Sequence, residues 1–193
     1  AGSEAMMHIL PVESARFRSI SSEFLALLKK VLKAPYVLDV IAVPGIRASL
    51  ERLAELLHRI QTALGEYLER ERGRFPRFYF VGDDDLLEML GHGRDIAHAS
   101  RHLSKMFAGL ATVHADGTLI RAVETTAGER VELIAPVAVR DGMPVHEWLD
   151  ALQNAIRTTL AHMLPSVLAA LESLVCDVPS VTSWLESAPT QLL

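Results

Sequence analysis

Three consecutive carboxylates, Asp83, Asp84 and Asp85, are the residues of this chain whose types and spacing most directly suggest chemistry. Paired carboxylates can hold two magnesium ions about 4 Å apart for nucleotidyl transfer. Such a site also needs a second strand after the acids, whereas a helical apolar pattern follows Asp85. We therefore favour a structural role, with Asp83 capping a helix and the other two in its first turn. A metal-dependent nucleotidyl-transfer enzyme that uses the three aspartates is the alternative.

Two histidines, His98 and His102, are one helical turn apart and could share a metal ion. A zinc protease would also need a glutamate directly after the first histidine, where this chain has Ala99. Basic residues lie on the same polar surface, at positions 94, 101 and 105. Because their charge would repel a dication, we expect a solvated basic face and no metal site here. The other histidines show no ligand spacing.

Nucleophilic catalysis and nucleotide binding find no support in the sequence. The serines at positions 19, 21 and 22 form no nucleophile elbow. Cys176 has no basic neighbour in sequence that would activate its thiol. No G-x-x-x-x-G-K-[ST] loop is present to cradle a phosphate. We therefore expect no catalytic, cofactor-binding or metal-binding residue in this chain.

A short aromatic run could instead bind nucleic acid. Aromatic residues stand at positions 75, 78, 79 and 80, beside arginines at positions 74 and 77. Such a group can stack single-stranded bases. We favour core filling at a junction between helices, because aromatic side chains bury large apolar areas.

The composition disfavours several classes of partner. Lys and Arg total 19 against 24 Asp and Glu, a formal net charge of -5, so neither nucleic acid nor an anionic membrane is an expected partner. A single cysteine excludes an intramolecular disulfide and indicates a reducing, intracellular setting. No secretory leader is recognised, and apolar runs end before the roughly 18 to 20 residues that span a bilayer. We expect no membrane insertion.

Helical periodicity is the main structural signal. From Ile46 to about Arg72, apolar residues alternate steps of four and three, which is a heptad pattern. Its positions are Ile46, Leu50, Leu53, Leu57, Ile60, Leu64 and Tyr67. A second apolar row, with Leu56 and Ala63, favours a helix bundle over a lone two-stranded coiled coil. We expect the first row to be the seam that packs against neighbouring helices.

Other elements are predicted on both sides of this helix. Helices are expected over 14–33, from 83, over 96–107 and from 144 to about 174. Pro165 is expected to kink or split the last one. Extended chain is expected over 75–81. Strands are expected over 111–115, 118–125 and 130–139, with a hairpin turn at Asp116-Gly117 and an edge or break at Pro136.

The predicted fold is therefore mainly α, a bundle or rod of amphipathic helices with a small antiparallel β-meander inserted at about residues 111–139. We divide the chain into a tag or disordered segment (1–9), a helical subdomain (10–109), the β-meander (110–140) and a further helical segment (141–193). The final segment lacks a stop signal, and we expect the chain to be part of a longer protein.

Two runs carry a resemblance to a known family. Residues 61–72 read QTALGEYLERER, and residues 75–87 read FPRFYFVGDDDLL. Shorter matches follow the same order, at positions 16–18, 29–31, 35–37, 105–109, 147–149 and 157–160. Together they resemble the linker, or N-terminal region 2, of dynein heavy chains over about residues 10–165. The first run is more similar to cytoplasmic than to axonemal members.

This resemblance implies a mostly helical lever that arches over a ring of AAA+ modules in the same heavy chain. It swings as the ring hydrolyses ATP and so drives movement along microtubules. The implied partners are that ring, other dynein subunits and microtubules, and the implied location is the cytoplasm and cytoskeleton. ATP and Mg²⁺ would bind elsewhere in the motor, so the resemblance implies no enzyme activity and no catalytic residue here. It also implies that the aromatic run pins a helix junction.

Overall fold

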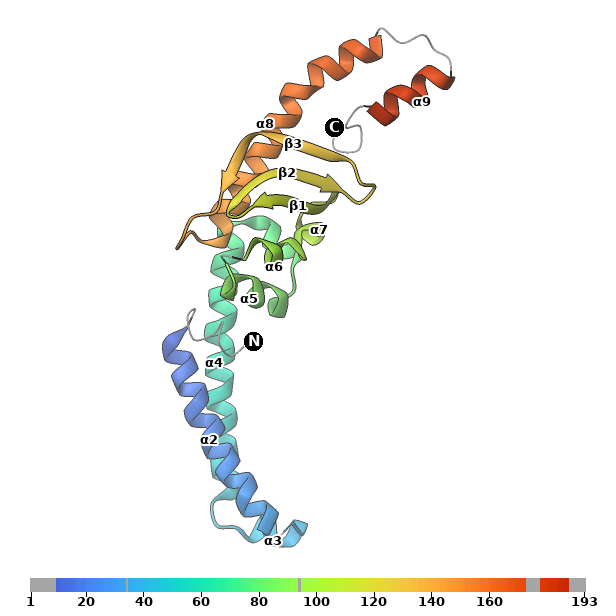
Figure 1. Ribbon diagram of the computed structural model, residues 1–193. Coiled ribbons are helices and arrows are strands. Elements are labelled where there is room, and N and C mark those ends of the chain that lie inside the picture. The colour runs from blue at the N-terminus through green and yellow to red at the C-terminus, as the bar shows by residue number, and fades with distance from the viewer. Residues whose placement is uncertain (1–9, 34, 94, 173–177, 188–193) are drawn as a thin grey trace. The chain divides into compact units, whose positions relative to one another are not determined.

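The computed structural model in Figure 1 describes residues 10–33, 35–93, 95–172 and 178–187. The predicted segment 1–9, Arg94 and Cys176 lie outside the described residues. Contacts group the chain into two units, unit 1 (Ala1–Gly73) and unit 2 (Arg74–Leu193). The boundaries predicted near 109 and 140 mark changes of secondary structure, and that division stays a prediction.

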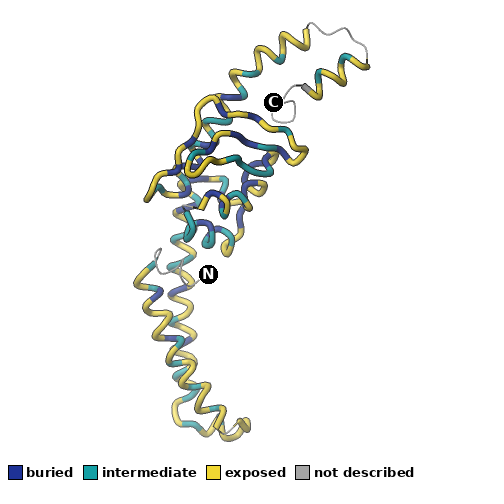
Figure 2. Tube along the Cα trace, viewed as in Figure 1, coloured by how far each residue is buried: buried dark blue, intermediate teal, exposed yellow. Residues whose placement is uncertain are grey.

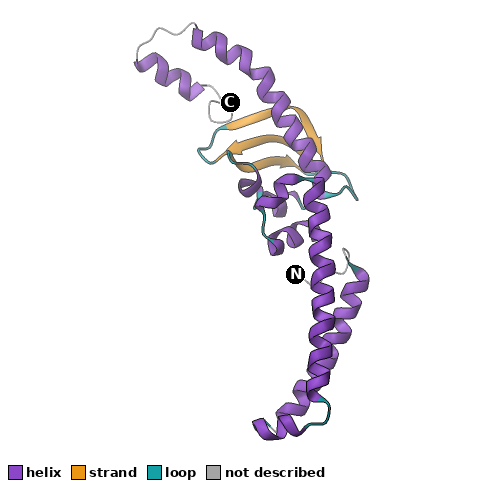
Figure 3. Ribbon diagram, turned by 180° about the vertical axis from the view of Figure 1, so that it is seen from behind, coloured by secondary structure: helices purple, strands orange, loops and turns teal. Residues whose placement is uncertain are grey.

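Unit 1 contains three described helices, α2 (Pro11–Lys33), α3 (Val37–Ala42) and all but the last residue of α4 (Ile46–Arg74). Helices α2 and α4 lie side by side in both views (Figures 1 and 3). The predicted long helix is confirmed, and the short apolar stretch before it forms α3. None of the described helices of the chain is long and apolar enough to cross a membrane.

Packing between α2 and α4 is confined to a narrow row. Ile20, Leu53 and Ile60 are buried, and Leu27 and Leu56 pack against them. The predicted heptad seam is only partly covered, because Leu50 is 44% exposed and Leu57 is 42% exposed. A straight helix drifts by about 20° per heptad, and α2 covers only one side of α4. Figure 2 shows the resulting alternation of buried and exposed residues.

Unit 2 begins with the aromatic run, which forms the 3₁₀ helix η1 (Pro76–Phe80). The prediction of extended chain over 75–81 was therefore wrong. Pro76 opens the turn, and the rings of Phe75 and Phe78 pack edge to face with centroids 5.0 Å apart. Residues three apart share a face in a 3₁₀ helix but not in a strand, so this helix buries both rings together.

Three short helices follow, α5 (Asp83–Gly91), α6 (Ile96–Ser100) and α7 (Leu103–Met106). The prediction of one helix over 96–107 was wrong, since the backbone breaks at His102 (φ −105°, ψ 0°). The apolar spacing gives no sign of this break, because Ala99, Leu103 and Met106 keep steps of four and three. The break therefore had no signal in the hydrophobic pattern.

The predicted meander is confirmed as a three-stranded antiparallel sheet in the order β1-β2-β3. Its strands are β1 (Leu110–Asp116), β2 (Leu119–Thr125) and β3 (Arg130–Ala138). The β1–β2 turn contains Gly117, whose φ of +61° suits glycine. Pro136 lies in the edge strand β3, near a register shift between Ile120 and Ala122.

Helix α8 (Val145–Glu172) packs against β3 and is followed by α9 (Val178–Ser187). Trp148, Leu149 and Leu152 on α8 have no exposed surface. The side chain of Thr159 ties the two elements together, accepting a hydrogen bond from the Ile134 N–H at 3.2 Å. Pro165 does not split this helix, which runs through it without a break (Figure 3). The fold class predicted from the sequence, mainly α with an inserted meander, is confirmed.

Candidate functional site

The three aspartates lie at the start of α5. Gly82 is the N-cap residue, so Asp83 occupies the first helical position and does not cap the helix as predicted. Asp84 and Asp85 lie in the first turn, as predicted, where the helix dipole favours negative charge. The acids form the first turn of α5 and follow the 3₁₀ helix η1, so no strand flanks them on either side. The structure therefore does not support the nucleotidyl-transfer alternative.

Asp85 also forms an ion pair with α7. Lys105 Nζ donates a hydrogen bond to Asp85 Oδ2 at 2.7 Å, and His102 Nδ1 lies 3.9 Å from Asp85 Oδ1. The hydrogen bond from Lys105 holds the pKa of Asp85 below its ordinary value. Desolvation opposes this lowering, and the charges of Lys105 and His102 add to it more weakly. The third aspartate thus links α5 to α7.

A histidine-rich cluster lies beside this ion pair. His98 Nε2 on α6 is 3.0 Å from Glu88 Oε1 on α5, and the ring of His98 stacks on His92 with centroids 4.7 Å apart. The prediction that His98 and His102 lie on a solvated face was wrong. The side chain of His98 is 13% exposed and that of His102 is 10% exposed.

The histidine cluster has the composition of a metal-binding group. Among the described residues, Glu88, His98 and His102 each offer a ligand atom within 4.8 Å of the other two. The imidazole nitrogens His98 Nε2 and His102 Nδ1 are buried and make no hydrogen bond. The sequence pattern points to the two histidines but not to Glu88, which precedes them by ten and fourteen residues with no recognised motif spacing.

Arg77 fixes the aromatic run in place. Its Nε donates to Gln153 Oε1 at 2.6 Å, and its Nη1 donates to the carbonyl oxygen of Met106 at 2.7 Å. The guanidinium carbon lies 4.6 Å from the ring centroid of Phe107. Arg77 therefore joins η1, α7 and α8, and the buried Phe78 is not available to stack a base. Exposed aromatic surface remains only on Tyr79 and Phe80 of this run.

Comparison with known proteins identifies the family. The profile of the family described as "Dynein heavy chain, N-terminal region 2" matches residues 1–166, most of the chain. The chain belongs to the dynein heavy chain family. Its long helix α4, the aromatic helix η1 and the acidic first turn of α5 are therefore features of a dynein heavy chain segment.

Individual relatives agree with this assignment. The cytoplasmic dynein heavy chain of Dictyostelium discoideum is 44% identical over 196 residues, and that of Drosophila melanogaster is 43% identical over 198 residues. Dynein heavy chain-like protein 1 of Plasmodium falciparum is 36% identical over 203 residues. Each alignment covers 100% of this chain and 4% of the relative, so the chain spans a small part of the dynein heavy chains that it matches.

Proposed function

We propose that this chain is part of the linker of a dynein heavy chain, the lever that swings over the AAA+ ring and drives ATP-dependent movement along microtubules. The observation that carries the proposal is the match of residues 1–166 to N-terminal region 2 of the family. The names of the relatives, cytoplasmic dynein heavy chains, support a role in the cytoplasm. Location on the cytoskeleton follows from the proposed movement along microtubules. The partners are the ring of the same heavy chain, other dynein subunits and microtubules.

This segment contributes mechanics and no catalysis. The acids that could have held Mg²⁺ begin a helix, and Asp85 pairs with Lys105. ATP and Mg²⁺ bind to other parts of the heavy chain in this proposal. Calorimetry of the 193-residue chain with Mg-ATP is expected to show no saturable binding. Saturable binding in the micromolar range would contradict this part of the proposal.

The stiffness of a lever made from α2 and α4 depends on contact between the two helices. Helical propensity alone gives marginal stability, so packing must supply the rest. The buried row of Ile20, Leu53 and Ile60 supplies an apolar contact, and an ion pair joins Glu23 on α2 to Arg52 on α4. Loss of the buried row is expected to let the helices bend separately.

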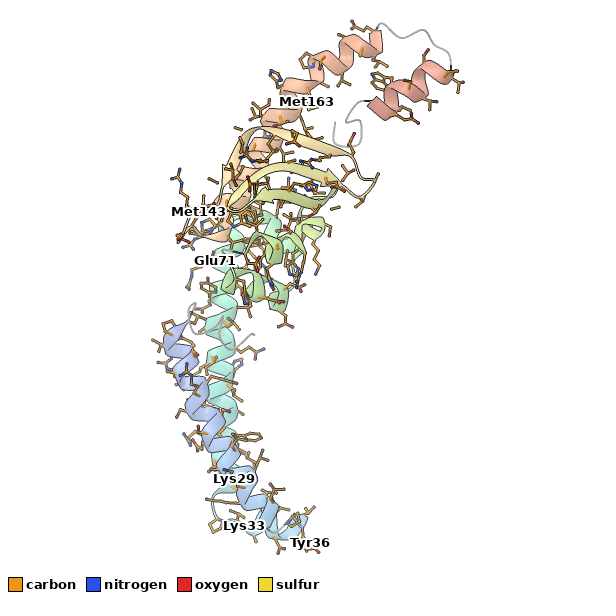
Figure 4. All side chains as sticks on the ribbon, in the orientation of Figure 1. Lys29, Lys33, Tyr36, Glu71, Met143 and Met163 are labelled. Carbon is orange, nitrogen blue, oxygen red and sulfur yellow. The ribbon has the colours of Figure 1, made fainter. Side chains whose placement is uncertain are left out.

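Exposed apolar side chains gather around the end of α2 and on α3. Leu32 is 76% exposed and Leu38 is 80% exposed. Figure 4 labels Lys29, Lys33 and Tyr36 in this region. Because the chain spans only 4% of its relatives, we assign this surface to contact with other segments of the same heavy chain.

The test is an Ile60→Ala substitution in the complete motor, with Gln61→Ala at the adjacent exposed position of α4 as the matched control. Microtubule gliding velocity and ATP turnover are measured on one preparation. We expect Ile60→Ala to slow gliding while the ring still binds nucleotide, because only the lever is softened. Gln61→Ala should leave both unchanged. If an Ile60→Ala motor glides at the normal velocity although the contact between α2 and α4 is shown to be weakened, the proposed mechanical role is wrong.

A further inference from the structure

We propose that Glu88, His98 and His102 bind one zinc ion that ties α5, α6 and α7 together. Each residue comes from a different part of this helical region, with Glu88 on α5, His98 on α6 and His102 at the N-cap of α7. The site is separate from the lever contact between α2 and α4 and does not depend on the proposed function. It replaces the sequence-based expectation of no metal, which assumed a solvated basic surface.

The distances suit a zinc ion. Zinc bonds to imidazole nitrogen and carboxylate oxygen are about 2.0 to 2.2 Å, so tetrahedral ligand atoms lie roughly 3.3 Å apart. His98 Nε2 and Glu88 Oε1 are 3.0 Å apart, close to that separation. The three ligand atoms all lie within 4.8 Å of one another. In the proposal, the side chains turn to bring the three ligand atoms to the separation that zinc requires.

A second observation is that two buried imidazole nitrogens make no hydrogen bond, although each lies near a carboxylate, Glu88 Oε1 for His98 and Asp85 Oδ1 for His102. His98 Nε2 and His102 Nδ1 are buried and accept or donate no hydrogen bond. A buried polar atom without a partner costs free energy, and most such atoms in proteins are paired with protein, water or an ion. The 3.0 Å approach to Glu88 does not satisfy His98, because its geometry is not that of a hydrogen bond. A metal ion bound at these nitrogens removes this cost.

The donor set favours zinc over magnesium or calcium. Two imidazoles and one carboxylate are ligands typical of zinc, with a fourth position for water or another oxygen. Magnesium and calcium prefer oxygen ligands throughout. Asp85 Oδ1, 3.9 Å from His102 Nδ1, is a nearby additional oxygen.

Among the described residues, positive charge near the cluster opposes the ion less than the sequence suggested; Arg94 lies outside them. Lys105 donates to Asp85 Oδ2 at 2.7 Å, so a carboxylate balances its charge. The side chain of Arg101 is exposed to solvent. The carboxylate of Glu88 adds negative charge at the ligand group itself.

Neighbouring groups hold the ligands in orientation. The ring of His92 stacks on His98, and His92 Nδ1 lies 2.9 Å from the carbonyl oxygen of Glu88. Asp95 Oδ1 accepts a hydrogen bond from the His98 backbone N–H at 3.0 Å. Such outer contacts fix ligand geometry in metal sites. They connect α5 to α6 through the same residues that provide the ligands.

The experiment measures zinc binding to the full 193-residue chain after removal of metal with a chelator. We expect calorimetry to give one zinc ion per chain, and Co²⁺ in its place to give the visible absorption bands of tetrahedral coordination. Magnesium should give no saturable binding at the same concentrations. Absence of stoichiometric zinc binding by the wild-type chain would falsify the proposal.

Substitutions locate the ion. Glu88→Gln and His98→Ala should each weaken zinc binding by more than about 100-fold, beyond what loss of an outer contact costs. His58→Ala, at an exposed histidine of α4, is the control and should bind zinc as the wild type does. Glu88→Gln preserves the side-chain volume, and its metal-free circular dichroism should match the wild type. A loss of less than about tenfold in Glu88→Gln would overturn the assignment.

Discussion

The two units bury their side chains in different ways. In unit 1, the contact between α2 and α4 rests on a row of buried apolar residues, Ile20, Leu53 and Ile60. In unit 2, large side chains such as Phe78, Trp148 and others on η1, α5, β2 and α8 have no exposed surface at all. A sheet with helices packed on it encloses an interior, whereas two helices side by side share only a strip. Unit 2 therefore has an enclosed core around η1, the sheet and the first half of α8, whereas the α2–α4 contact of unit 1 does not enclose one. Exposed apolar side chains occur in both units, for example Leu32 in unit 1 and Leu168 in unit 2.

The largest expected effect distinguishes two phenylalanines of η1. Phe78 is 0% exposed and Phe80 is 70% exposed. Phe78→Ala should lower the free energy of unfolding of unit 2 by about 3 to 5 kcal/mol, because it leaves a cavity in the closed core. Phe80→Ala should change it by no more than about 0.5 kcal/mol. Urea unfolding followed by circular dichroism measures both, and similar losses would show that unit 2 is not closed here.

A second pair of substitutions, at Ile60 and Leu57, tests the row of buried residues between α2 and α4 in unit 1. Ile60 is 7% exposed, so Ile60→Ala should cost about 2 to 5 kcal/mol, toward the lower end because the site is shallow. Leu57 belongs to the same heptad pattern but is 42% exposed, so Leu57→Ala should cost at most about 1 kcal/mol. Thermal or urea unfolding gives both values. If both substitutions lower the free energy of unfolding equally, Leu57 is packed as well as Ile60, and the heptad seam is continuous.

Two glycines should respond to alanine with opposite signs. A Cβ at Gly93 in unit 2 would lie 2.9 Å from Val145 Cγ2, whereas one at Gly65 on α4 meets nothing within 4 Å. Because Val145 is buried and has little room to move, Gly93→Ala should destabilise unit 2 by about 1 to 3 kcal/mol. Gly65→Ala should stabilise α4 by about 0.5 to 1 kcal/mol, since alanine loses less backbone entropy in a helix. If both substitutions shift the unfolding midpoint in the same direction, Gly93 is not at a close-packed position in unit 2 or Gly65 is not at an open position in unit 1.

The smallest effect concerns Asp85 at the surface of unit 2. Its pKa is lowered from 3.8 mainly by the hydrogen bond from Lys105. A carboxyl whose pKa is lower in the folded state stabilises the fold above its unfolded pKa, and this contribution disappears as the pH falls through the folded pKa. Lys105→Met should raise the pKa of Asp85, as measured by carboxyl carbon NMR titration. Lys105→Arg keeps the charge and is the control that should leave the pKa low.

Local sequence patterns predicted most of the elements. The heptad spacing gave α4, and the Asp116-Gly117 turn with its alternating flanks gave the first hairpin of the meander. These features depend on residues close together in the chain, where periodicity and turn geometry act directly. The runs at 61–72 and 75–87 also gave the family, which the profile match confirms.

Errors arose where a residue's environment is set by distant parts of the chain. Phe75–Val81 reads as extended chain because aromatic residues favour strands, but burial of Phe75 against Phe78 selects a 3₁₀ helix. The exposure of Leu57 depends on which residues of α4 are in contact with α2. The heptad pattern of α4 alone carries no information about that contact. Periodicity identifies an apolar face, and only the neighbouring element decides how much of it is covered.

The sequence by itself determined the helical class, the inserted meander, the helical start at the acidic triplet and the family of this chain. Tertiary structure decided which members of each apolar row are buried, and it brought Glu88 to His98 across the turn between α5 and α6. The physical reason is that secondary structure follows from local backbone preference and periodicity. The burial of a side chain, and its contacts with side chains of other helices, depend on tertiary packing. The spacing of residues along the chain does not specify that packing.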